Sequence, residues 1–277
     1  MSEKAVFTWN DKKFYQHDIS NSISEIGIKK GDIIYVQSDL GKFGKLSEIK
    51  DKLQYHTVFL DACLDVIGSN GTIIIPTFTY SFGDSFITEK GRMYNPSNIF
   101  DVNNSPSILN YFTEVARLSE NFSRSDDPML SVVSRGPKTE QIIKNISDHS
   151  LGKGSVWENL QNQNAHNLII GYKFDTAFIH YIEERCNVPY RHNMKFTGKI
   201  IKDDVEFEKS CIYFGKNREI KTKRNTQRLY KKLVNEDVLK KTKLGGGDMM
   251  AIKSNDLFKS TKNLIDEDSH ALVDAID

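Results

Sequence analysis

The sequence predicts an α/β fold in which a layered, mixed sheet is flanked by helices, with a small β-rich C-terminal addition. Up to residue 187, short apolar runs alternate with stretches whose apolar residues recur at helical spacing. After residue 191, short strand-like segments around Asp203 and Asp204 are typical of antiparallel hairpins. The 277 residues are 38% hydrophobic, enough for one sizeable core. We therefore expect a single domain over residues 1–277, with an α/β core at about 15–190 and a hairpin and helical addition at about 191–277.

The elements follow in order from their apolar patterns. Helices with one apolar face are expected at residues 18–26, 55–67 and 105–118. The third opens with Ser105-Pro106, which suits an N-cap and a first helical position. Buried strands, which are short apolar runs, are expected at residues 32–36, 72–75, 130–133 and 168–170. The C-terminal part is expected to hold strands at 194–201, 205–208, 211–214 and 249–252, a basic helical stretch at 221–242 and a closing helix at 256–265.

One histidine–carboxylate pair follows the last strand of the expected core. The run at 168–170 ends at Gly171, and Asp175 and Thr176 offer an N-cap for a following helix. His180 and Glu183 are three residues apart and share a face of that helix. Because open α/β sheets bind ligands at the carboxyl ends of their strands, this pair is placed where a site is expected.

A neutral imidazole held by a carboxylate is a general base suited to pH 7, able to deprotonate an amine or a hydroxyl. The pair also has a plainer interpretation as a surface ion pair. A metal-dependent hydrolase is disfavoured because His-Glu-x-x-His is absent, and we expect no metal. Cys186 as a thiol nucleophile is disfavoured too, since a cysteine at the end of an apolar helix face is usually packed and inert.

Other candidate residues follow buried strands. The segment 37–44 has two glycines directly after a strand, so its backbone N–H groups can approach a ligand closely, although it can equally be a connecting loop. It is neither a P-loop nor a dinucleotide fingerprint. Asp126 and Asp127 precede Pro128, and they form either a solvated turn or a site for a cationic substrate group.

The composition excludes several classes of function. A net charge of +1 gives no electrostatic footprint for nucleic acid, and no apolar stretch is long enough to span a membrane. The basic stretch at 221–242 is broken by two acidic residues, which favours a solvated helix. The chain opens without an export signal, and its three scattered cysteines fit a reducing compartment, so a cytoplasmic location is expected.

Five segments together resemble the aminoglycoside 3-N-acetyltransferase family, including relatives encoded with bacterial surface-polysaccharide genes. They are Gly-Asp-Ile-Ile-Tyr-Val-Gln-Ser-Asp-Leu-Gly at 31–41, Gly-Thr-Ile-Ile-Ile-Pro-Thr-Phe-Thr at 71–79, Arg-Ser-Asp-Asp-Pro-Met-Leu-Ser-Val at 124–132, Gly-Lys-Gly-Ser-Val-Trp at 152–157 and Phe-Asp-Thr-Ala-Phe-Ile-His-Tyr-Ile-Glu at 174–183. The segments occur in the family's order. The resemblance implies transfer of an acetyl or related acyl group from acetyl-CoA to an amine on a mixed α/β fold.

The resemblance also implies roles for individual residues. His180 would deprotonate the amine, Glu183 would orient its ring, and Asp175 is a further catalytic candidate. Backbone N–H groups of a strand-end loop would stabilise the oxyanion. Acetyl-CoA would be bound by Ser38, Asp39, Leu40, Gly41, Phe43, Gly44, Thr77 and Ser131. The acceptor would be bound by Tyr80, Asp126, Asp127, Tyr190 and Arg191.

Two departures from the family pattern concern the acceptor. Gln37-Ser38 and Asp127-Pro128 stand where the aminoglycoside enzymes usually have His-Ser and His-Pro. The balance of 38 basic to 37 acidic residues also lacks the acidic excess that would steer a polycation. We therefore expect a nucleotide-linked amino sugar destined for a surface glycan. Three alternatives remain: acetylation of aminoglycoside antibiotics with resistance, a non-catalytic sugar-binding or assembly subunit, and the metal-dependent hydrolase. A homo-oligomer is left open.

Overall fold

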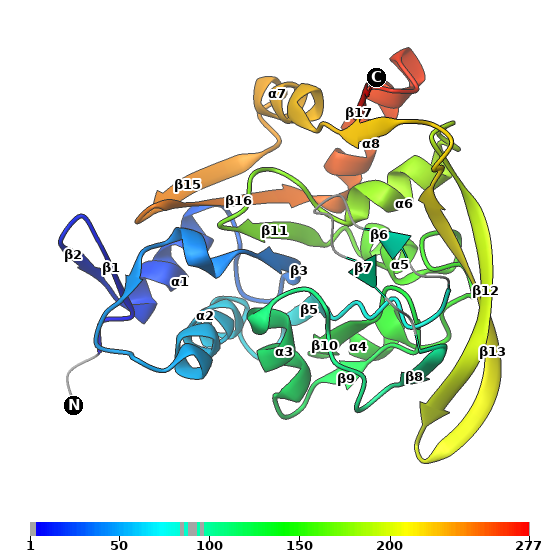
Figure 1. The fold of residues 1–277 in the computed structure, drawn as a ribbon. Coiled ribbons are helices and arrows are strands. Elements are labelled where there is room, and N and C mark those ends of the chain that lie inside the picture. The colour runs from blue at the N-terminus through cyan, green and yellow to red at the C-terminus, as the bar shows by residue number, and fades with distance from the viewer. Residues whose placement is uncertain (1–3, 84–85, 88–92, 95–96, 277) are drawn as a thin grey trace.

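The computed structural model describes residues 4–83, 86–87, 93–94 and 97–276 (Figure 1). Its centre is a seven-stranded mixed sheet, confirming the predicted fold class. The strand order is β15-β16-β11-β3-β5-β10-β9. From one edge to the other these strands span Lys240–Leu244, Gly247–Lys253, His166–Ile170, Ile33–Ser38, Thr72–Pro76, Val132–Arg135 and Ser123–Arg124.

The three middle strands are parallel, and the outer ones run antiparallel to their neighbours. All residues of β5 and β11 are buried, as expected for apolar runs covered on both faces. In the register between β11 and β3, Ile170 lies opposite Ser38. The carboxyl ends of these two strands therefore meet at one edge of the sheet, where the chain continues into the predicted acetyl-CoA loop and the histidine-bearing helix.

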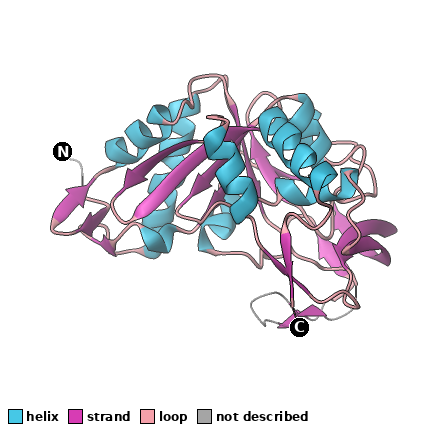
Figure 2. Cartoon of the chain, turned by 90° about the horizontal axis from the view of Figure 1, so that it is seen from above, coloured by secondary structure: helices cyan, strands magenta, loops and turns pink. Residues whose placement is uncertain are grey.

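Helices cover both faces of the sheet (Figure 2). Apolar residues of α1, α2 and α3 pack in one core cluster with side chains such as Val36 and Ile170, and those of α4 to α8 pack in the other with Tyr35 and Ile169. The helices span Gln16–Glu25, Lys52–Ile67, Tyr111–Leu118, Thr139–Ile143, Val156–Asn162, Phe178–Arg185, Gln227–Asn235 and Ser254–Glu267, from α1 to α8.

Helix α3 starts later than predicted. Asn110 is its N-cap, and the Asn110 side chain accepts from the N–H of Thr113 at 3.1 Å. The Ser105 hydroxyl instead accepts a hydrogen bond from the N–H of Asp101 at 2.9 Å. The predicted start at Ser105-Pro106 is therefore wrong, because this serine closes the preceding turn, and a stronger capping box follows five residues later.

The C-terminal part divides between two sheets. β12 (Arg191–Lys202) and β13 (Val205–Lys216) form one long hairpin, whose turn residues Asp203 and Asp204 both have positive φ. β8 (Ile99–Asp101) adds to β12 in parallel. β15 and β16, however, join the main sheet beside β11, so that sheet continues past residue 190, the boundary expected for the α/β core. The basic stretch at 221–242 holds β14 (Thr222–Arg224), α7 and part of β15.

The remaining elements are short. The strands β1 (Phe7–Trp9), β2 (Lys12–Phe14) and β4 (Lys45–Leu46) form a small sheet near the N-terminus, with the 3₁₀ turn η1 (Leu40–Lys42) before β4. β6 (Phe86–Ile87) pairs with β7 (Met93–Tyr94), and β17 (Val273–Ala275) pairs with β14.

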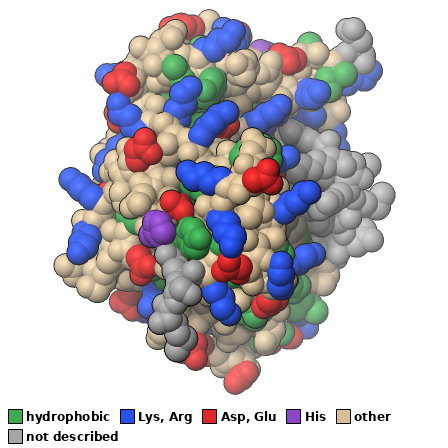
Figure 3. All heavy atoms as spheres, turned by 90° about the vertical axis from the view of Figure 1, so that its left-hand side faces the viewer, with side chains coloured by type: hydrophobic (Ala, Val, Ile, Leu, Met, Phe, Trp, Pro, Cys, Tyr) green, Lys and Arg blue, Asp and Glu red, His purple; other side chains and the backbone are tan. Residues whose placement is uncertain are grey.

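Basic and acidic side chains are interspersed on the face that Figure 3 presents. This is the even distribution of charge that disfavours a nucleic-acid footprint on that face. In the described part of the chain, no helix has both the length and the apolar character needed to cross a membrane.

Candidate active site

Contacts from β3 hold the start of helix α6. Ala177 is the N-cap of α6, and its N–H donates to the Gln37 side-chain oxygen at 2.7 Å. The Thr176 hydroxyl accepts from the N–H of Phe178 at 3.3 Å. Asp175 accepts from the N–H of Thr176 at 2.9 Å, outside the helix, and its carboxylate also binds an arginine described below, so it caps no N–H group of α6. The predicted N-cap is therefore wrong for Asp175, and Gln37 supplies a cap from a neighbouring strand.

Gly171 allows β11 to pass close to the loop after β3. Its φ is +76°, a left-handed conformation that glycine adopts readily. A Cβ atom at this position would lie 2.2 Å from the carbonyl oxygen of Asp39. The N–H of Asp39 donates to the carbonyl of Ile170 at 2.7 Å. These contacts bring the two strand-end loops together at the sheet edge.

His180 and Glu183 form the predicted pair. His180 Nδ1 lies 2.6 Å from Glu183 Oε2, while the Glu183 side chain is buried and that of His180 remains 24% exposed. An ionised carboxylate only accepts hydrogen bonds, so Nδ1 must carry the proton. The assignment leaves the lone pair on Nε2, which makes Nε2 the basic atom of the ring.

Three further side chains surround Glu183. The Tyr190 hydroxyl donates to Glu183 Oε1 at 2.9 Å. Arg191 Nε forms an ion pair with Glu183 Oε2 at 2.9 Å, and Arg224 Nη1 lies 3.4 Å from Oε1. Tyr190 and Arg191 are predicted from the sequence as acceptor-binding residues; in the structure both contact the carboxylate that is paired with His180.

Arg224 joins Asp175 to the same network. Its Nη2 lies 2.6 Å from Asp175 Oδ1, and its Nε lies 2.9 Å from Oδ2, a bidentate pair. Asp175 is thus linked to Glu183 through one guanidinium. Sequence analysis missed Arg224, because it lies 41 residues after Glu183 in a basic stretch that carries no recognisable motif.

The network sets the protonation state of its members. Burial lowers the pKa of His180 to about 4, assisted by the nearby cations Arg191 and Arg224 and opposed by Glu183. Burial alone would raise the pKa of Glu183, but Arg191, His180 and Arg224 together hold it well below its usual range. At neutral pH the pair is therefore a neutral imidazole beside an ionised carboxylate, which is the form a general base requires.

The residues of the predicted acetyl-CoA loop differ in burial and in their contacts. Ser38, at the end of β3, is buried, and its hydroxyl has no hydrogen-bond partner among the described residues. Gly41 is exposed. Phe43 and Gly44 are packed instead: the Phe43 ring is buried, and a Cβ on Gly44 would lie 2.2 Å from the carbonyl oxygen of Thr8. Leu40 is buried too. Asp39 and the Phe43 ring both lie beside Gly171, at the edge where β3 and β11 end, because a Cβ on that glycine would be 2.2 Å from the Asp39 carbonyl oxygen and 3.1 Å from the ring.

Thr77 and Ser131 lie at the end of β5, fully buried against each other. The Ser131 hydroxyl donates to the carbonyl of Thr77 at 2.7 Å, and the Thr77 hydroxyl donates to the carbonyl of Ser131 at 3.2 Å. Arg124 Nε also donates to the Thr77 hydroxyl at 3.2 Å. Each hydroxyl thus has partners within the protein, and the role of both residues in binding acetyl-CoA stays a prediction.

The carboxylates of the adjacent residues Asp126 and Asp127 both have partners within the protein, but of different kinds. Asp127 is buried and accepts from the N–H groups of Met129 and Leu130 at 2.8 and 3.0 Å. Burial raises the Asp127 pKa. Asp126 forms ion pairs with Lys202 and Lys209 at 3.3 and 3.5 Å.

Tyr80 is a partly buried residue with a φ of +47°, and its ring packs edge-on against that of Tyr213. With both aspartates occupied, the predicted acceptor-binding set of Tyr80, Asp126 and Asp127 remains untested and offers no free carboxylate for a cationic group.

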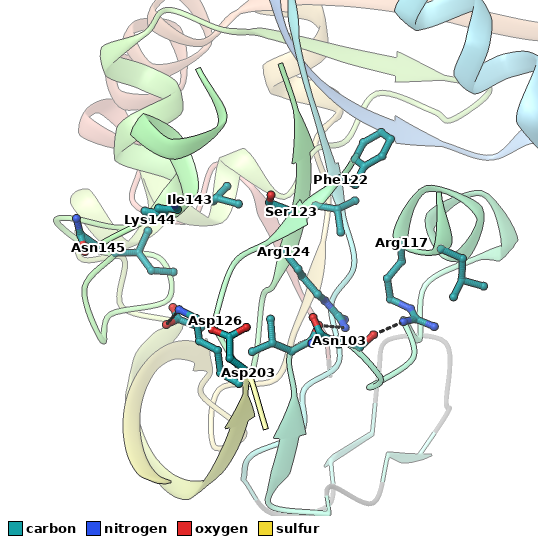
Figure 4. A pocket seen from close by; sticks show the side chains of 15 residues that line it. Asn103, Arg117, Phe122, Ser123, Arg124, Asp126, Ile143, Lys144, Asn145 and Asp203 are labelled. Carbon is teal, nitrogen blue, oxygen red and sulfur yellow. Dashed lines mark hydrogen bonds and ion pairs between the residues drawn. The ribbon is translucent and has the colours of Figure 1, made fainter. Parts of the chain in front are cut away.

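A cavity of about 700 Å³ lies at the edge strand β9, at the other side of the sheet from β15 (Figure 4). Among the predicted site residues only Asp126 lines it. Figure 4 shows Arg117, Arg124 and Lys144 around it, but both arginines are engaged. Arg117 binds Glu114, and Arg124 Nη2 donates to the carbonyl of Thr77. Neither His180 nor Glu183 lines this cavity, so it does not coincide with the predicted catalytic pair.

The described residues contain no group of three or more histidine, cysteine, aspartate or glutamate side chains placed to hold a metal ion.

Comparison with known proteins identifies the family. A sequence profile described as aminoglycoside 3-N-acetyltransferase matches residues 36–266. No curated protein matches the chain in sequence. The fold is similar to aminoglycoside acetyltransferase AAC(3)-Xa, with a TM-score of 0.75, 16% identity and coverage of 91% of this chain and 92% of that one. It is also similar to AAC-IIIb in a binary complex with CoASH (TM-score 0.73, 17% identity, coverage 91% and 96%) and to the YokD protein from Bacillus subtilis (0.70, 20%, 90% and 92%). The chain belongs to the aminoglycoside 3-N-acetyltransferase family.

Proposed function

We propose that this acetyltransferase acetylates an amine of an aminoglycoside or another amino sugar, with His180 as the general base. The observation that carries the proposal is the 2.6 Å contact between His180 Nδ1 and the buried Glu183, on a helix capped by a residue of β3. It leaves Nε2 as the basic atom of a ring that is 24% exposed, on the helix whose N-cap N–H group is bound by Gln37 of β3.

Each residue of the network has its own role in the transfer of the acetyl group. Acetyl-CoA supplies a thioester carbonyl, at which the acceptor nitrogen forms a C–N bond as the C–S bond breaks. His180 Nε2 accepts the proton that the nitrogen loses, and the same ring returns it to the departing thiolate. Glu183 holds the ring in one tautomer and stabilises the transient imidazolium, as the carboxylate of a catalytic triad does. Tyr190, Arg191 and Arg224 hold Glu183 in place.

The end of β3 offers a hydrogen-bond donor that could bind the acyl donor. Ser38 provides a buried hydroxyl that lacks a hydrogen-bond partner among the described residues, at the strand end that contacts the start of α6. A buried hydroxyl without a partner is costly, so a ligand group that accepts its hydrogen bond would be stabilised there. We infer that Ser38 contributes to the donor site, with Asp39, Leu40 and Gly41 next to it.

Two acceptors are candidates. Family membership supports an aminoglycoside, since the similar structures include an AAC(3)-IVa variant in complex with apramycin and AAC-VIa bound to sisomicin. A nucleotide-linked amino sugar for a surface glycan is the second candidate. The state of the carboxylates favours it: Asp126, Asp127, Asp175 and Glu183 are each engaged by cations or N–H groups.

A cytoplasmic location is part of the proposal. The structure supports it with the free thiols of Cys63, Cys186 and Cys211, of which Cys63 and Cys211 are buried. Free thiols are typical of reducing compartments.

Thioester consumption with acetyl-CoA tests the function, measured across aminoglycosides and nucleotide-linked amino sugars. We expect His180→Ala to lower kcat by about 100-fold or more, the usual contribution of a general base. His56→Ala is the matched control, because His56 lies on α2, which packs on the other face of the sheet. If His180→Ala retained its activity, the assignment of the base would be wrong; if no amine were acetylated, the proposed acceptor class would be wrong.

A further inference from the structure

A second cavity, of about 340 Å³, lies between the end of β13 and the start of β14. Its described lining contains three basic side chains and no carboxylate: Lys216, Arg218, Ile220, Lys221, Thr222 and Ile276. Of residues 216–224, five are lysine or arginine and one, the exposed Glu219, is acidic. A concave surface with one sign of charge attracts an anionic group.

Two strands connect this cavity to the catalytic pair. Lys216 lies opposite Arg191 in the β12/β13 register, and Arg191 is the ion-pair partner of Glu183. Directly opposed Cα atoms of an antiparallel pair are about 5 Å apart. On β14, Thr222 lies two residues before Arg224, so the two share a side of the strand at a Cα separation of about 7 Å. The cavity-lining residues Lys216 and Thr222 are therefore close neighbours of Arg191 and Arg224, whose side chains contact Glu183.

The basic groups differ in how much of their hydrogen-bonding capacity is used. Lys216 Nζ donates to the carbonyl of Thr222, which fixes it at the cavity wall. Lys221 Nζ makes no hydrogen bond or ion pair within the described part of the chain. Arg218 already has an interaction partner, so it adds positive charge without being a free donor. Lys221 is thus the side chain most available to a ligand.

We propose that this cavity binds the phosphate group of the acceptor, which makes the acceptor a phosphorylated amino sugar such as a nucleoside diphosphate sugar. The inference rests on the proposed acetyltransferase function and narrows its substrate class. A phosphate in the cavity places the attached sugar toward Arg191 and Arg224, and so toward His180. A polycation, by contrast, would meet three basic side chains with no carboxylate in the described lining to offset them.

Acetyl-CoA is the competing occupant, because it carries phosphates too. The segment expected to bind it, residues 38–44, contributes no residue to this cavity. The cavity is built by residues that follow α6 in the chain: Lys216 at the end of β13, Thr222 at the start of β14, the segment between them, and Ile276 after β17. This separation favours the acceptor.

Calorimetry with inorganic pyrophosphate and with uridine diphosphate tests the site without relying on catalysis. We expect Lys221→Gln to weaken binding of both probes by about threefold to tenfold, the scale of one charge-assisted contact at a partly exposed site. Lys221→Glu should weaken it further. Lys223→Gln is the matched control, since Lys223 is an exposed neighbour on β14 that does not line the cavity, and its effect should stay under about twofold.

Kinetic assays then separate the two substrates. We expect Lys221→Gln to raise KM for a nucleoside diphosphate amino sugar and to leave KM for acetyl-CoA and for acetyl-dephospho-CoA unchanged. A raised KM for acetyl-CoA alone would assign the cavity to the donor and overturn the inference, as would unchanged pyrophosphate binding in Lys221→Gln. If the probes bind as expected but no amine is acetylated, the proposed function fails while the phosphate site stands.

Discussion

Replacing Glu183 by glutamine removes one negative charge and little volume from the centre of the network. The Glu183 side chain is fully buried and lies within 3.4 Å of His180, Tyr190, Arg191 and Arg224. Removing one partner of a buried ion pair typically costs about 3–5 kcal/mol, because the remaining charge is left uncompensated. Here we expect about 3 kcal/mol, since Arg224 keeps Asp175 and Arg191 keeps the carbonyl of Phe214.

The same substitution should also slow the acetyl transfer in which we propose that Glu183 takes part. A glutamine at 183 can donate to Nδ1 and hold the opposite tautomer, with the proton on Nε2, where the base must be free. We expect kcat in thioester consumption to fall by about 10²- to 10⁴-fold. The free energy of unfolding, measured in urea, should fall by about 3 kcal/mol.

Glu184→Gln is the matched control for both measurements. Glu184 is the next residue on α6, and its buried Oε2 has no partner among the described residues. Burial raises its pKa, so removing its charge should change stability by less than about 1 kcal/mol. We expect its kcat to stay within about threefold of the wild type. A Glu183→Gln enzyme as stable and as active as Glu184→Gln would refute the role given to this carboxylate.

Two further predictions concern protonation and backbone strain. The pKa of His180 is lowered to about 4, so its ring should stay neutral in NMR titrations until the pH is well below the usual 6.5. Between pH 4 and 6.5 this histidine is protonated only in the unfolded chain, so the free energy of unfolding should rise with pH across that range. Arg224→Gln removes a nearby cation and should move the titration upward; an unmoved midpoint would contradict the attribution. Gly171→Ala should destabilise the protein in urea by about 2–4 kcal/mol, from the left-handed φ and the 2.2 Å approach of the Asp39 oxygen. Gly27→Ala is its control, with a φ of +91° and open space around the Cβ position, and should cost only about 1–2 kcal/mol; equal losses would show that the close approach is unimportant.

The central sheet was predictable because its strands are short apolar runs. β3, β5, β10 and β11 all overlap the predicted strands, and His180 and Glu183 meet because helical spacing alone brings positions three apart together. The turn at Asp203 and Asp204 was predictable too, since aspartate tolerates positive φ.

What the sequence could not reveal are pairings between distant segments. Arg224 reaches Asp175 and Glu183 from β14, and Gln37 caps a helix 140 residues later. No local pattern encodes such contacts. The carboxylates of Asp126 and Asp127 were equally ambiguous, because the lysines and N–H groups that occupy them become neighbours only in the folded chain.

The position of β16 has a consequence for how the enzyme is made. β11 leads into the catalytic helix, yet one of its edges is completed only by residues 247–253. During synthesis, that edge stays open until residues 247–253 have left the ribosome, and the open edge is a template for pairing with other chains. Competence for acetyl transfer should therefore arise only once this segment has paired with β11, and a chain interrupted before residue 247 should be recovered as aggregate.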